Sequence, residues 1–470
     1  MGREVGAEQN VDWAGTGGLG PVVAETPTAA PKARMALVAL RLRAWGWLSV
    51  LSLADQGLTS GASFGVNLLL ARWMAPAAYG AFAVAFAGFL FVSGFHNVLL
   101  VEPMTVNGPS CYPERLSEYF GAQLRAHVTL AGGLSAICVA AAGLLGAWRP
   151  GGVFPGLLLI AGLSVPFLLL FVLARRMCYV AHDPRIAVQA SAVYALLLLA
   201  GASGLRQAGR LNSATAFLWM ACCSLLAALF ILRRLRVSFR LISAGRNISL
   251  KQLLRENWGY GRWLMLTTVL SWSSVQVQTI LAAGFLGFAG AGILRAMQLP
   301  SLAMMQVVAA TTLLVLPSLS HEMGRGNLDR LRKKAVFSAV FLAGLGMLFV
   351  STWFFLAGPL EKILFGGKYA AHANLFAVLG LVAVFTGFSS SLSLALRILR
   401  KAHLELLAYV CSAITAVILA VVCMPRWGLR GAAVSIVGSS AVLAVAVLAC
   451  FLKWGKPETA GSVGIAGEEL

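Results

Sequence analysis

Residues 153–174 read VFPGLLLIAGLSVPFLLLFVLA, a run of 22 residues without a charge that ends directly before Arg175 and Arg176. A helix of about 20 apolar residues spans the hydrocarbon core of a bilayer. Because lipid offers no hydrogen-bond partners, every backbone polar group must be satisfied within its own segment, as it is in a helix. The stretch therefore predicts a transmembrane helix.

Runs of this kind recur about twelve times along the chain, separated by short polar joints. Hydrophobic residues make up 59% of the sequence and charged residues 11%, which excludes an ordinary soluble domain of this length. We therefore expect an all-α polytopic membrane protein. The expected spans are 46–71, 79–102, 124–147, 153–174, 186–205, 212–232, 263–285, 291–319, 335–357, 373–396, 403–424 and 429–452.

The basic residues are distributed unevenly over the joints. The N-terminal tail, the even-numbered joints and the C-terminal tail hold 28 of the 37 Lys and Arg residues, whereas the odd-numbered joints hold 8. Because cytoplasmic loops are enriched in Lys and Arg, both termini are expected in the cytoplasm. The Lys and Arg residues behind the net charge of +20 are then topology determinants, and their side chains also contact anionic lipid headgroups. No nucleic-acid partner is expected.

The second half of the chain repeats part of the sequence pattern of the first half. An offset of 221 residues pairs Arg176 with Arg397 and His182 with His403. Six spans per repeat is an even number, so the expected halves are two six-helix lobes that run in the same direction, with a ligand path between them. The expected parts are a tail (1–44), an N-lobe (45–232), a basic linker (233–262), a C-lobe (263–453) and a second tail (454–470).

Two spans carry polar stripes. Asp55, Thr59, Ser63 and Asn67 share one face of the first span at about 100° per residue. In the seventh span, the corresponding one, a stripe contains Thr267, Ser271, Ser274 and Gln278. Together the stripes are predicted to line a hydrated cavity between the lobes. The alternative is that each hydroxyl bonds only to the backbone of its own helix.

Charges inside spans carry more information, because an ionised group at the bilayer centre costs roughly 3 kcal/mol or more. We expect Arg295 and Arg262 to hold an anionic group, and Asp55, with Glu102 or His96, to supply a counter-charge or a site for ion or proton coupling. The alternative is that such side chains extend to the membrane interface, which we favour for Glu102.

Signatures of catalysis are missing from the sequence. It contains no glycine-rich phosphate loop with a Lys, no His/Cys cluster with metal-ligand spacing and no nucleophile elbow. The eight cysteines follow no disulfide framework. We therefore predict transport without catalytic residues, cofactor or metal.

Several motifs resemble a known family. They are Asp55-Gln56-Gly57-Leu58 with the stretch 67–82, His96-Asn97 with Glu102-Pro103-Met104, and Arg175-Arg176 with Tyr179 and Asp183-Pro184-Arg185. In these stretches the chain resembles the bacterial polysaccharide and oligosaccharide flippases of the multidrug/oligosaccharidyl-lipid/polysaccharide exporter superfamily.

The resemblance implies an alternating-access flippase in the bacterial cytoplasmic membrane. Its substrate would be a polyprenyl-diphosphate-linked oligosaccharide, moved to the outer leaflet for exopolysaccharide or surface-polysaccharide biosynthesis. Membrane lipids and a polysaccharide polymerase with its export machinery would be its partners. Two alternatives stay open: a cation-coupled multidrug exporter of the same superfamily, and a membrane glycan polymerase or ligase.

Overall fold

The computed structural model describes residues 31–148, 151–237, 248–399 and 401–454. The chain divides into two compact units, Met1–Leu51 and Ser52–Leu470. In the first unit, the described part is the helical stretch from Pro31 to Leu51. The second unit contains all the cavities discussed below.

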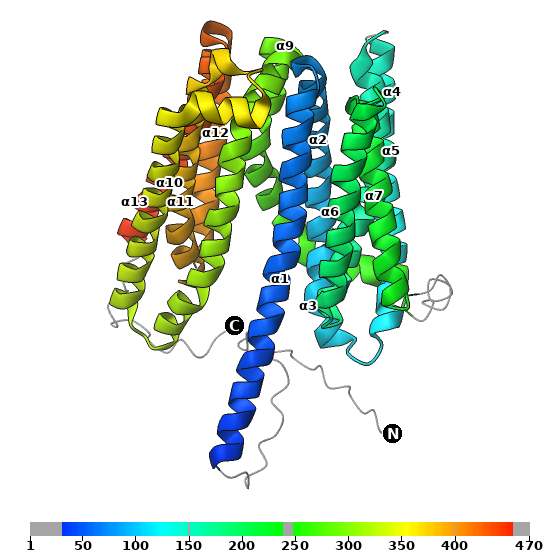
Figure 1. The fold of residues 1–470 in the computed structure, drawn as a ribbon. Helices are drawn as coiled ribbons and strands as arrows, with labels where there is room; N and C mark the ends of the chain where they lie inside the picture. Colours follow the sequence, from blue (N-terminus) through cyan, green and yellow to red (C-terminus); the bar gives the residue numbers. More distant parts are fainter. Residues whose placement is uncertain (1–30, 149–150, 238–247, 400, 455–470) are drawn as a thin grey trace, which may run out of the picture. The chain divides into compact units, whose positions relative to one another are not determined.

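Long helices make up the described part of the second unit (Figure 1). A single helix, α1, begins in the first unit and ends in the second. The helices are α1 (Pro31–Trp73), α2 (Pro76–His96), α3 (Glu102–Cys111), α4 (Leu116–Trp148), α5 (Val153–Val180), α6 (Pro184–Gln207), α7 (Ser213–Arg234), α9 (Leu250–Gly324), α10 (Leu328–Phe365), α11 (Asn374–Ile398), α12 (Ala402–Trp427) and α13 (Leu429–Trp454), with a π-helical turn η1 (Asn97–Val101) and a 3-10 turn η3 (Ala370–His372).

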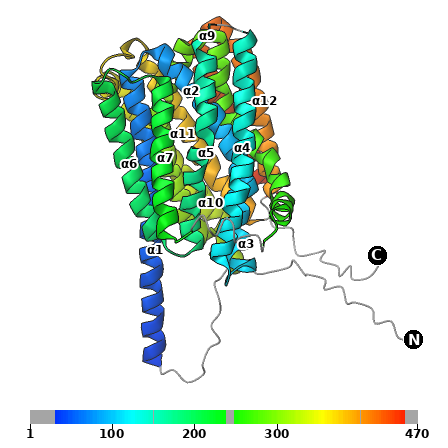
Figure 2. The ribbon, with the colours of Figure 1, turned by 90° about the vertical axis from the view of Figure 1, so that its right-hand side faces the viewer.

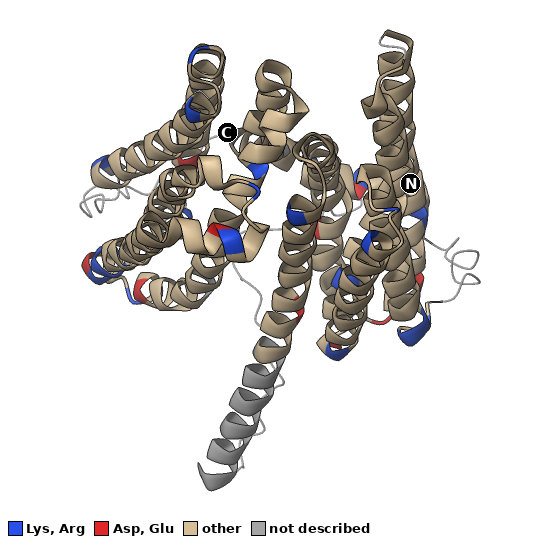
Figure 3. Ribbon diagram, turned by 45° about the horizontal axis from the view of Figure 1, so that its top comes forward, with Lys and Arg blue, Asp and Glu red and all other residues tan. Residues whose placement is uncertain are grey.

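The all-α polytopic fold predicted from the sequence is confirmed. Within the described residues, ten helices are long and apolar enough to cross a membrane. The expected first span, 46–71, lies in α1, and the spans 263–285 and 291–319 both lie in α9. Charged residues are sparse along the helices and gather mostly near their ends (Figure 3).

Local sequence explains where several helices start and stop. Pro76 and Pro184 stand in the first turns of α2 and α6, where a missing N–H is harmless. Asn212 caps α7 by accepting a hydrogen bond from the Thr215 backbone N–H. Gly287, with φ +72°, breaks the helical path of α9 between the two expected spans. The expected linker, 233–262, is helical from Leu250 onward.

The helices pack mainly with neighbours from the same half of the chain. In the first half, α5 packs against α4 and α7, and α6 packs against α7; in the second half, α11 packs against α10 and α13, and α12 against α13. The two halves meet where α2 packs along α9. Gly80 and Gly292 make that approach possible: a Cβ on Gly80 would lie 1.7 Å from the carbonyl oxygen of Phe288.

Candidate substrate cavity

Asp55 is the centre of a buried hydrogen-bond network. Its side chain is 1% exposed. Arg175 of α5 donates from Nη2 to Oδ2 at 2.6 Å and from Nε to Oδ1 at 3.3 Å. The Tyr179 hydroxyl, one helical turn further along α5, donates to Oδ2 at 2.6 Å. Ser191 of α6 donates to Oδ1. Both carboxylate oxygens are therefore fully used, and the guanidinium neutralises the charge.

A cavity of about 570 Å³ adjoins this network, and we call it the Asp55 cavity. It lies between the α1 segment that begins at Ser52, the C-terminal half of α5 and the C-terminal half of α9. Besides Asp55 and Arg175 it exposes the Arg176 guanidinium. Its lining residues are Ser52, Leu53, Asp55, Gln56, Gly57, Ser60, Val172, Arg175, Arg176, Tyr179, Gln306, Ala309 and Ala310.

A second cavity of about 390 Å³ continues from the first, and we call it the Arg295 cavity. The two share Gln56, Ser60, Arg175 and Gln306 in their walls. The second cavity lies between α1, α2 and α9, so it is bounded by helices from both halves of the chain. Its lining residues are Gln56, Thr59, Ser60, Ser63, Phe64, Asn67, Phe86, Leu90, Arg175, Gln276, Arg295, Leu299, Leu302, Ala303 and Gln306.

The stripe predicted on the first span thus lines these two cavities. Asp55 lies in the wall of the first, and Thr59, Ser63 and Asn67 lie in the wall of the second. The hydroxyl of Thr59 also donates to the Asp55 carbonyl oxygen at 2.8 Å, and Asn67 Nδ2 donates to the Ser63 carbonyl oxygen at 2.8 Å. These polar groups therefore hydrogen-bond to the backbone of their own helix, and Asn67 Oδ1 also accepts from the Tyr79 hydroxyl at 3.5 Å.

Arg295 is buried, with 7% of its surface exposed, yet it carries its charge without an acidic neighbour. Within the described part of the chain, none of the ion pairs involves its guanidinium. Its Nη1 donates a hydrogen bond to Gln298 Oε1, one helical turn further along α9, at 3.4 Å. An uncompensated buried cation is costly. The site is therefore suited to an incoming anion.

Arg295 also borders a third cavity, of about 220 Å³, which we call the C-half cavity. This cavity lies among α9, α11, α12 and α13. Gln278, from the predicted stripe of the seventh span, lines it and is 1% exposed. The guanidinium therefore stands between the Arg295 cavity on one side and a polar chamber within the second half on the other.

The other predicted site residues lie elsewhere. His96 is fully buried and its Nε2 lies 3.0 Å from Nδ1 of His127 on α4. Glu102 accepts a hydrogen bond from Asn97 Nδ2 at 2.8 Å, across the turn η1. The Ser271 hydroxyl donates to the Thr268 carbonyl oxygen, in its own helix. Arg262 is exposed on α9, and the side chain of Ser274 is outside the described residues.

None of the four described residues, His96, Glu102, Arg262 and Ser271, is among those lining the three cavities. Sequence reasoning also missed members of the cavity walls. It assigned no role to Gln276 or Gln306, although amides within apolar runs are scarce enough to be a usable signal. Among the described residues, no group of three or more His, Cys, Asp or Glu side chains could hold a metal ion.

The expected outer ends of α1 and α10 are joined by a set of contacts that we call the outer clasp. Lys368 Nζ, in the loop after α10, donates to the carbonyl oxygens of Arg72 at 2.5 Å and Met74 at 2.8 Å. Arg72 Nη1 donates to the Ile363 carbonyl oxygen at 3.0 Å, and the Tyr369 hydroxyl to that of Ala71 at 2.9 Å. Burial lowers the pKa of Lys368, while the carbonyl end of α1 favours its charge.

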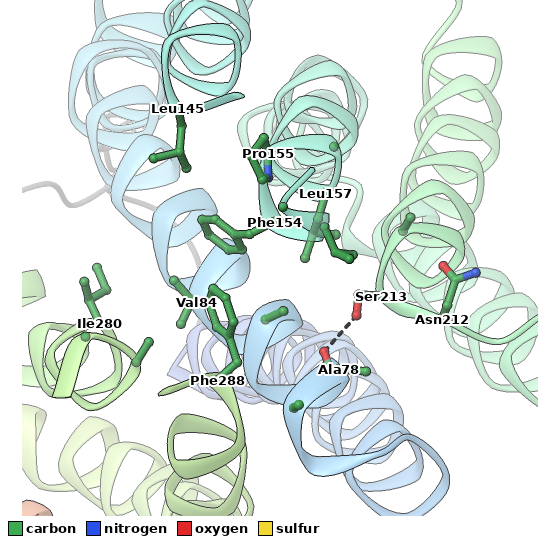
Figure 4. Close-up of a pocket in the computed structure, with 18 of the residues that line it drawn as sticks. Ala78, Val84, Leu145, Phe154, Pro155, Leu157, Asn212, Ser213, Ile280 and Phe288 are labelled. Carbon is green, nitrogen blue, oxygen red and sulfur yellow. Dashed lines mark hydrogen bonds between the residues drawn. The ribbon is translucent and has the colours of Figure 1, made fainter. Parts of the chain in front are cut away.

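An apolar cavity of about 1100 Å³ lies on the same expected outer side, among α2, α4, α5, α7 and α9 (Figure 4). The rings of Phe154 and Phe288 stack there with their centroids 4.9 Å apart. The Ser213 hydroxyl donates to the carbonyl oxygen of Ala78, another lining residue, at 2.7 Å. We call this space the outer apolar cavity.

Comparisons with known proteins identify the fold. No protein-family model matches the sequence, and no curated protein matches it either. Several solved structures are similar to this chain over most of their length. An inward-facing multidrug resistance MATE family transporter of the MOP superfamily aligns with a TM-score of 0.69 at 14% identity, covering 85% of this chain and 93% of that one.

The lipid II flippase MurJ, in an inward closed conformation, aligns with a TM-score of 0.61 at 15% identity, covering 86% of this chain and 87% of that one. A MOP superfamily transporter from Pyrococcus furiosus, described as having a binding pocket of reverse polarity, aligns with a TM-score of 0.60 at 15% identity. The alignment with this transporter covers 88% of this chain and 94% of that one. Flippases and drug exporters both occur among these neighbours, and this chain has the fold of the MOP-superfamily transporters.

Proposed function

We propose that the chain is a flippase for a polyprenyl-diphosphate-linked oligosaccharide, which it moves outward across the cytoplasmic membrane by alternating access. The observation that carries this proposal is the charge of the adjoining Asp55 and Arg295 cavities. Their walls hold three arginines, Arg175, Arg176 and Arg295, against the single carboxylate of Asp55. The sum of the charges is +2, which favours an anionic substrate.

The state of Asp55 supports the same assignment. An exporter of organic cations needs a carboxylate that can receive the cation. Asp55 accepts four hydrogen bonds and its charge is balanced by Arg175. The guanidinium of Arg295, in contrast, is available to a diphosphate, whose hydration shell it can replace together with the neighbouring amides of Gln276 and Gln306.

The apolar part of such a substrate can stay in lipid. The outer apolar cavity is wide enough for part of a polyprenyl chain and is lined almost wholly by carbon, apart from Asn212 and Ser213. The outer clasp and the contact between Gly80 and α9 close the expected outer ends of the two halves. This state would receive substrate from the cytoplasmic side. The protein would lie in the bacterial cytoplasmic membrane. The uneven distribution of Lys and Arg over the joints would place both termini inside.

The test is a flipping assay in proteoliposomes with a fluorescent polyprenyl-diphosphate-linked sugar and a membrane-impermeant quencher. Arg295→Gln is expected to slow flipping about 10- to 100-fold, because a hydrogen bond to a charged group is worth about 1.5–3 kcal/mol. Arg262→Gln is the matched control, since it removes the same charge from the same helix outside the cavity walls and is expected to keep the wild-type rate.

Equal flipping by Arg295→Gln and wild type would overturn the assignment of Arg295, and absence of flipping by the wild-type protein would overturn the function.

A cation-coupled multidrug exporter is the second candidate. Phe64 and Phe86 line the Arg295 cavity and offer aromatic faces of the kind that hold organic cations. Transport of ethidium by the same proteoliposomes, dependent on a proton or sodium gradient and abolished by Asp55→Asn, would favour this candidate over the flippase.

A further inference from the structure

A groove on the face formed by α4, α5 and α7 belongs to none of the cavities above. Its volume is about 680 Å³, and it is lined by residues of α4, α5 and α7. In Figure 2, α5 lies between α4 and α7. We call it the α4–α7 groove. Its lining residues are Leu124, His127, Val128, Pro166, Phe167, Leu170, Leu225, Leu229, Leu232, Arg233, Arg236 and Val237.

Apart from His127, the groove is apolar along its length, and it is basic at one end. Leu225, Leu229 and Arg233 follow one face of α7 at intervals of four residues. At 1.5 Å per residue, the distance along α7 from Leu225 to Arg233 is about 12 Å. This is close to half of the bilayer's hydrocarbon core, which is about 30 Å thick. The groove therefore has the length of an acyl chain in a single leaflet.

The basic end is built by an unusual backbone. Arg236 has φ +55°, in the left-handed region that non-glycine residues rarely adopt. Its N–H donates to the Arg233 carbonyl oxygen at 3.1 Å, and the N–H of Val237 donates to that of Leu232 at 3.0 Å. These are the two bonds of a Schellman motif, whose left-handed position is usually glycine. The chain instead places a second arginine at the mouth of the groove.

Charge decides what fits this mouth. The lining includes Arg233 and Arg236, and among the described residues that form it none is acidic. Both arginines are exposed, so a headgroup at the membrane surface can reach them. The neighbouring Arg234 faces another way: its Nη2 donates to Gln189 Oε1 on α6 at 3.3 Å, and its guanidinium lies over the Phe230 ring. Only two of these three arginines therefore serve the groove.

We propose that the α4–α7 groove is a binding site for an anionic glycerophospholipid of the cytoplasmic leaflet. One acyl chain lies along Leu225 and Leu229, and the phosphate contacts the guanidinium groups of Arg233 and Arg236. A phospholipid fits better than the lipid carrier of the substrate, because the groove shares no lining residue with the Asp55 or Arg295 cavity.

The experiment measures lipid binding to the full-length protein. Purified protein in a mild detergent is titrated with phosphatidylglycerol or with phosphatidylcholine of the same acyl chains, and bound lipid is counted by native mass spectrometry. Arg233→Gln/Arg236→Gln is compared with Arg185→Gln/Arg234→Gln. The second pair removes the same charge from exposed residues on the expected cytoplasmic side, outside the groove. Leu225→Trp narrows the apolar part without changing any charge.

We expect the wild type and the control pair to retain one phosphatidylglycerol at lipid concentrations at which phosphatidylcholine is lost. Arg233→Gln/Arg236→Gln should weaken phosphatidylglycerol binding at least 10-fold, and Leu225→Trp should weaken binding of both lipids. Equal binding of the two lipids by the wild type, or equal losses in the two double variants, would overturn the proposal. So would displacement of bound phosphatidylglycerol by equimolar undecaprenyl phosphate, because the groove would then serve the carrier lipid.

Discussion

At the scale of single residues, Asp55 and Arg295 show how one type of feature can have two meanings. Both are ionisable residues within membrane spans, and both are buried. Asp55 has four donors around it, whereas the described residues offer Arg295 no carboxylate partner. A charge with its partners in place is a structural element. A charge without an ionic partner in a cavity wall is a candidate binding group.

The Asp55 network predicts a loss of stability. Asp55→Asn leaves the Arg175 guanidinium without its counter-charge, and we expect unfolding to become easier by about 1–3 kcal/mol, the cost of an unsatisfied buried polar group. Thermal unfolding in detergent, followed by tryptophan fluorescence, measures this. Asp55→Asn/Arg175→Gln should recover part of the loss, because both charges are then absent. A double variant as unstable as the sum of the two single variants would show that the pair is not coupled.

At the scale of elements, the outer clasp joins the end of α1 to the loop after α10. Lys368 donates to the last carbonyl groups of α1, which a helix leaves without partners. Gly80 and Gly292 bring α2 and α9 together on the same side. Next to the polar contacts, the rings of Tyr79 and Tyr369 are buried in the same hydrophobic core.

Removing the clasp should shift the population towards a state open on the expected outer side. Spin labels are attached at Ala75→Cys and Ala371→Cys, and the distribution of distances between them is measured. We expect Lys368→Met to have a larger fraction of molecules at the longer distance than the parent protein. The parent must first lose its exposed cysteines, Cys111, Cys222 and Cys411. Lys362→Met is the control, because Lys362 is an exposed lysine on the same segment. Identical distance distributions for the two variants would remove Lys368 from the closure.

At the scale of the whole molecule, the proposed substrate charge has an energetic consequence. When the inside of the membrane is negative, moving an anion outward is favourable by about 2.3 kcal/mol per charge per 100 mV. A diphosphate with two charges would gain about 4–5 kcal/mol on the same basis. The membrane potential can thus drive outward flipping, and ion coupling through Asp55 is not required.

Proteoliposomes with an imposed potassium diffusion potential test this. Outward flipping of the labelled polyprenyl-diphosphate sugar should accelerate when the interior is negative and slow when the sign is reversed. Proton and sodium gradients without a potential should change the rate by less than twofold. A rate that follows the proton gradient and ignores the potential would contradict this account, and would return Asp55 or Glu102 to consideration as a coupling group.

The sequence by itself determined the fold class, a polytopic all-α membrane protein. A run such as 153–174 can only be a helix in lipid, whatever surrounds it, because its backbone must satisfy itself. The sequence also determined that Asp55, Thr59, Ser63 and Asn67 share one face, since that follows from the helical period alone. These features depend on residues near one another in the chain.

Only the tertiary structure decided what each face meets. Asp55 and Arg175 are 120 residues apart, and nothing in either helix's period states that their faces meet. For the same reason, the pairing of His96 with His127 could not be predicted from the sequence. Nor could the division of the seventh-span stripe, in which Gln278 lines the C-half cavity and Ser271 bonds to its own helix backbone. Helical periodicity fixes the direction of a side chain relative to its own axis. The rotation of each helix about that axis is fixed by packing against its neighbours.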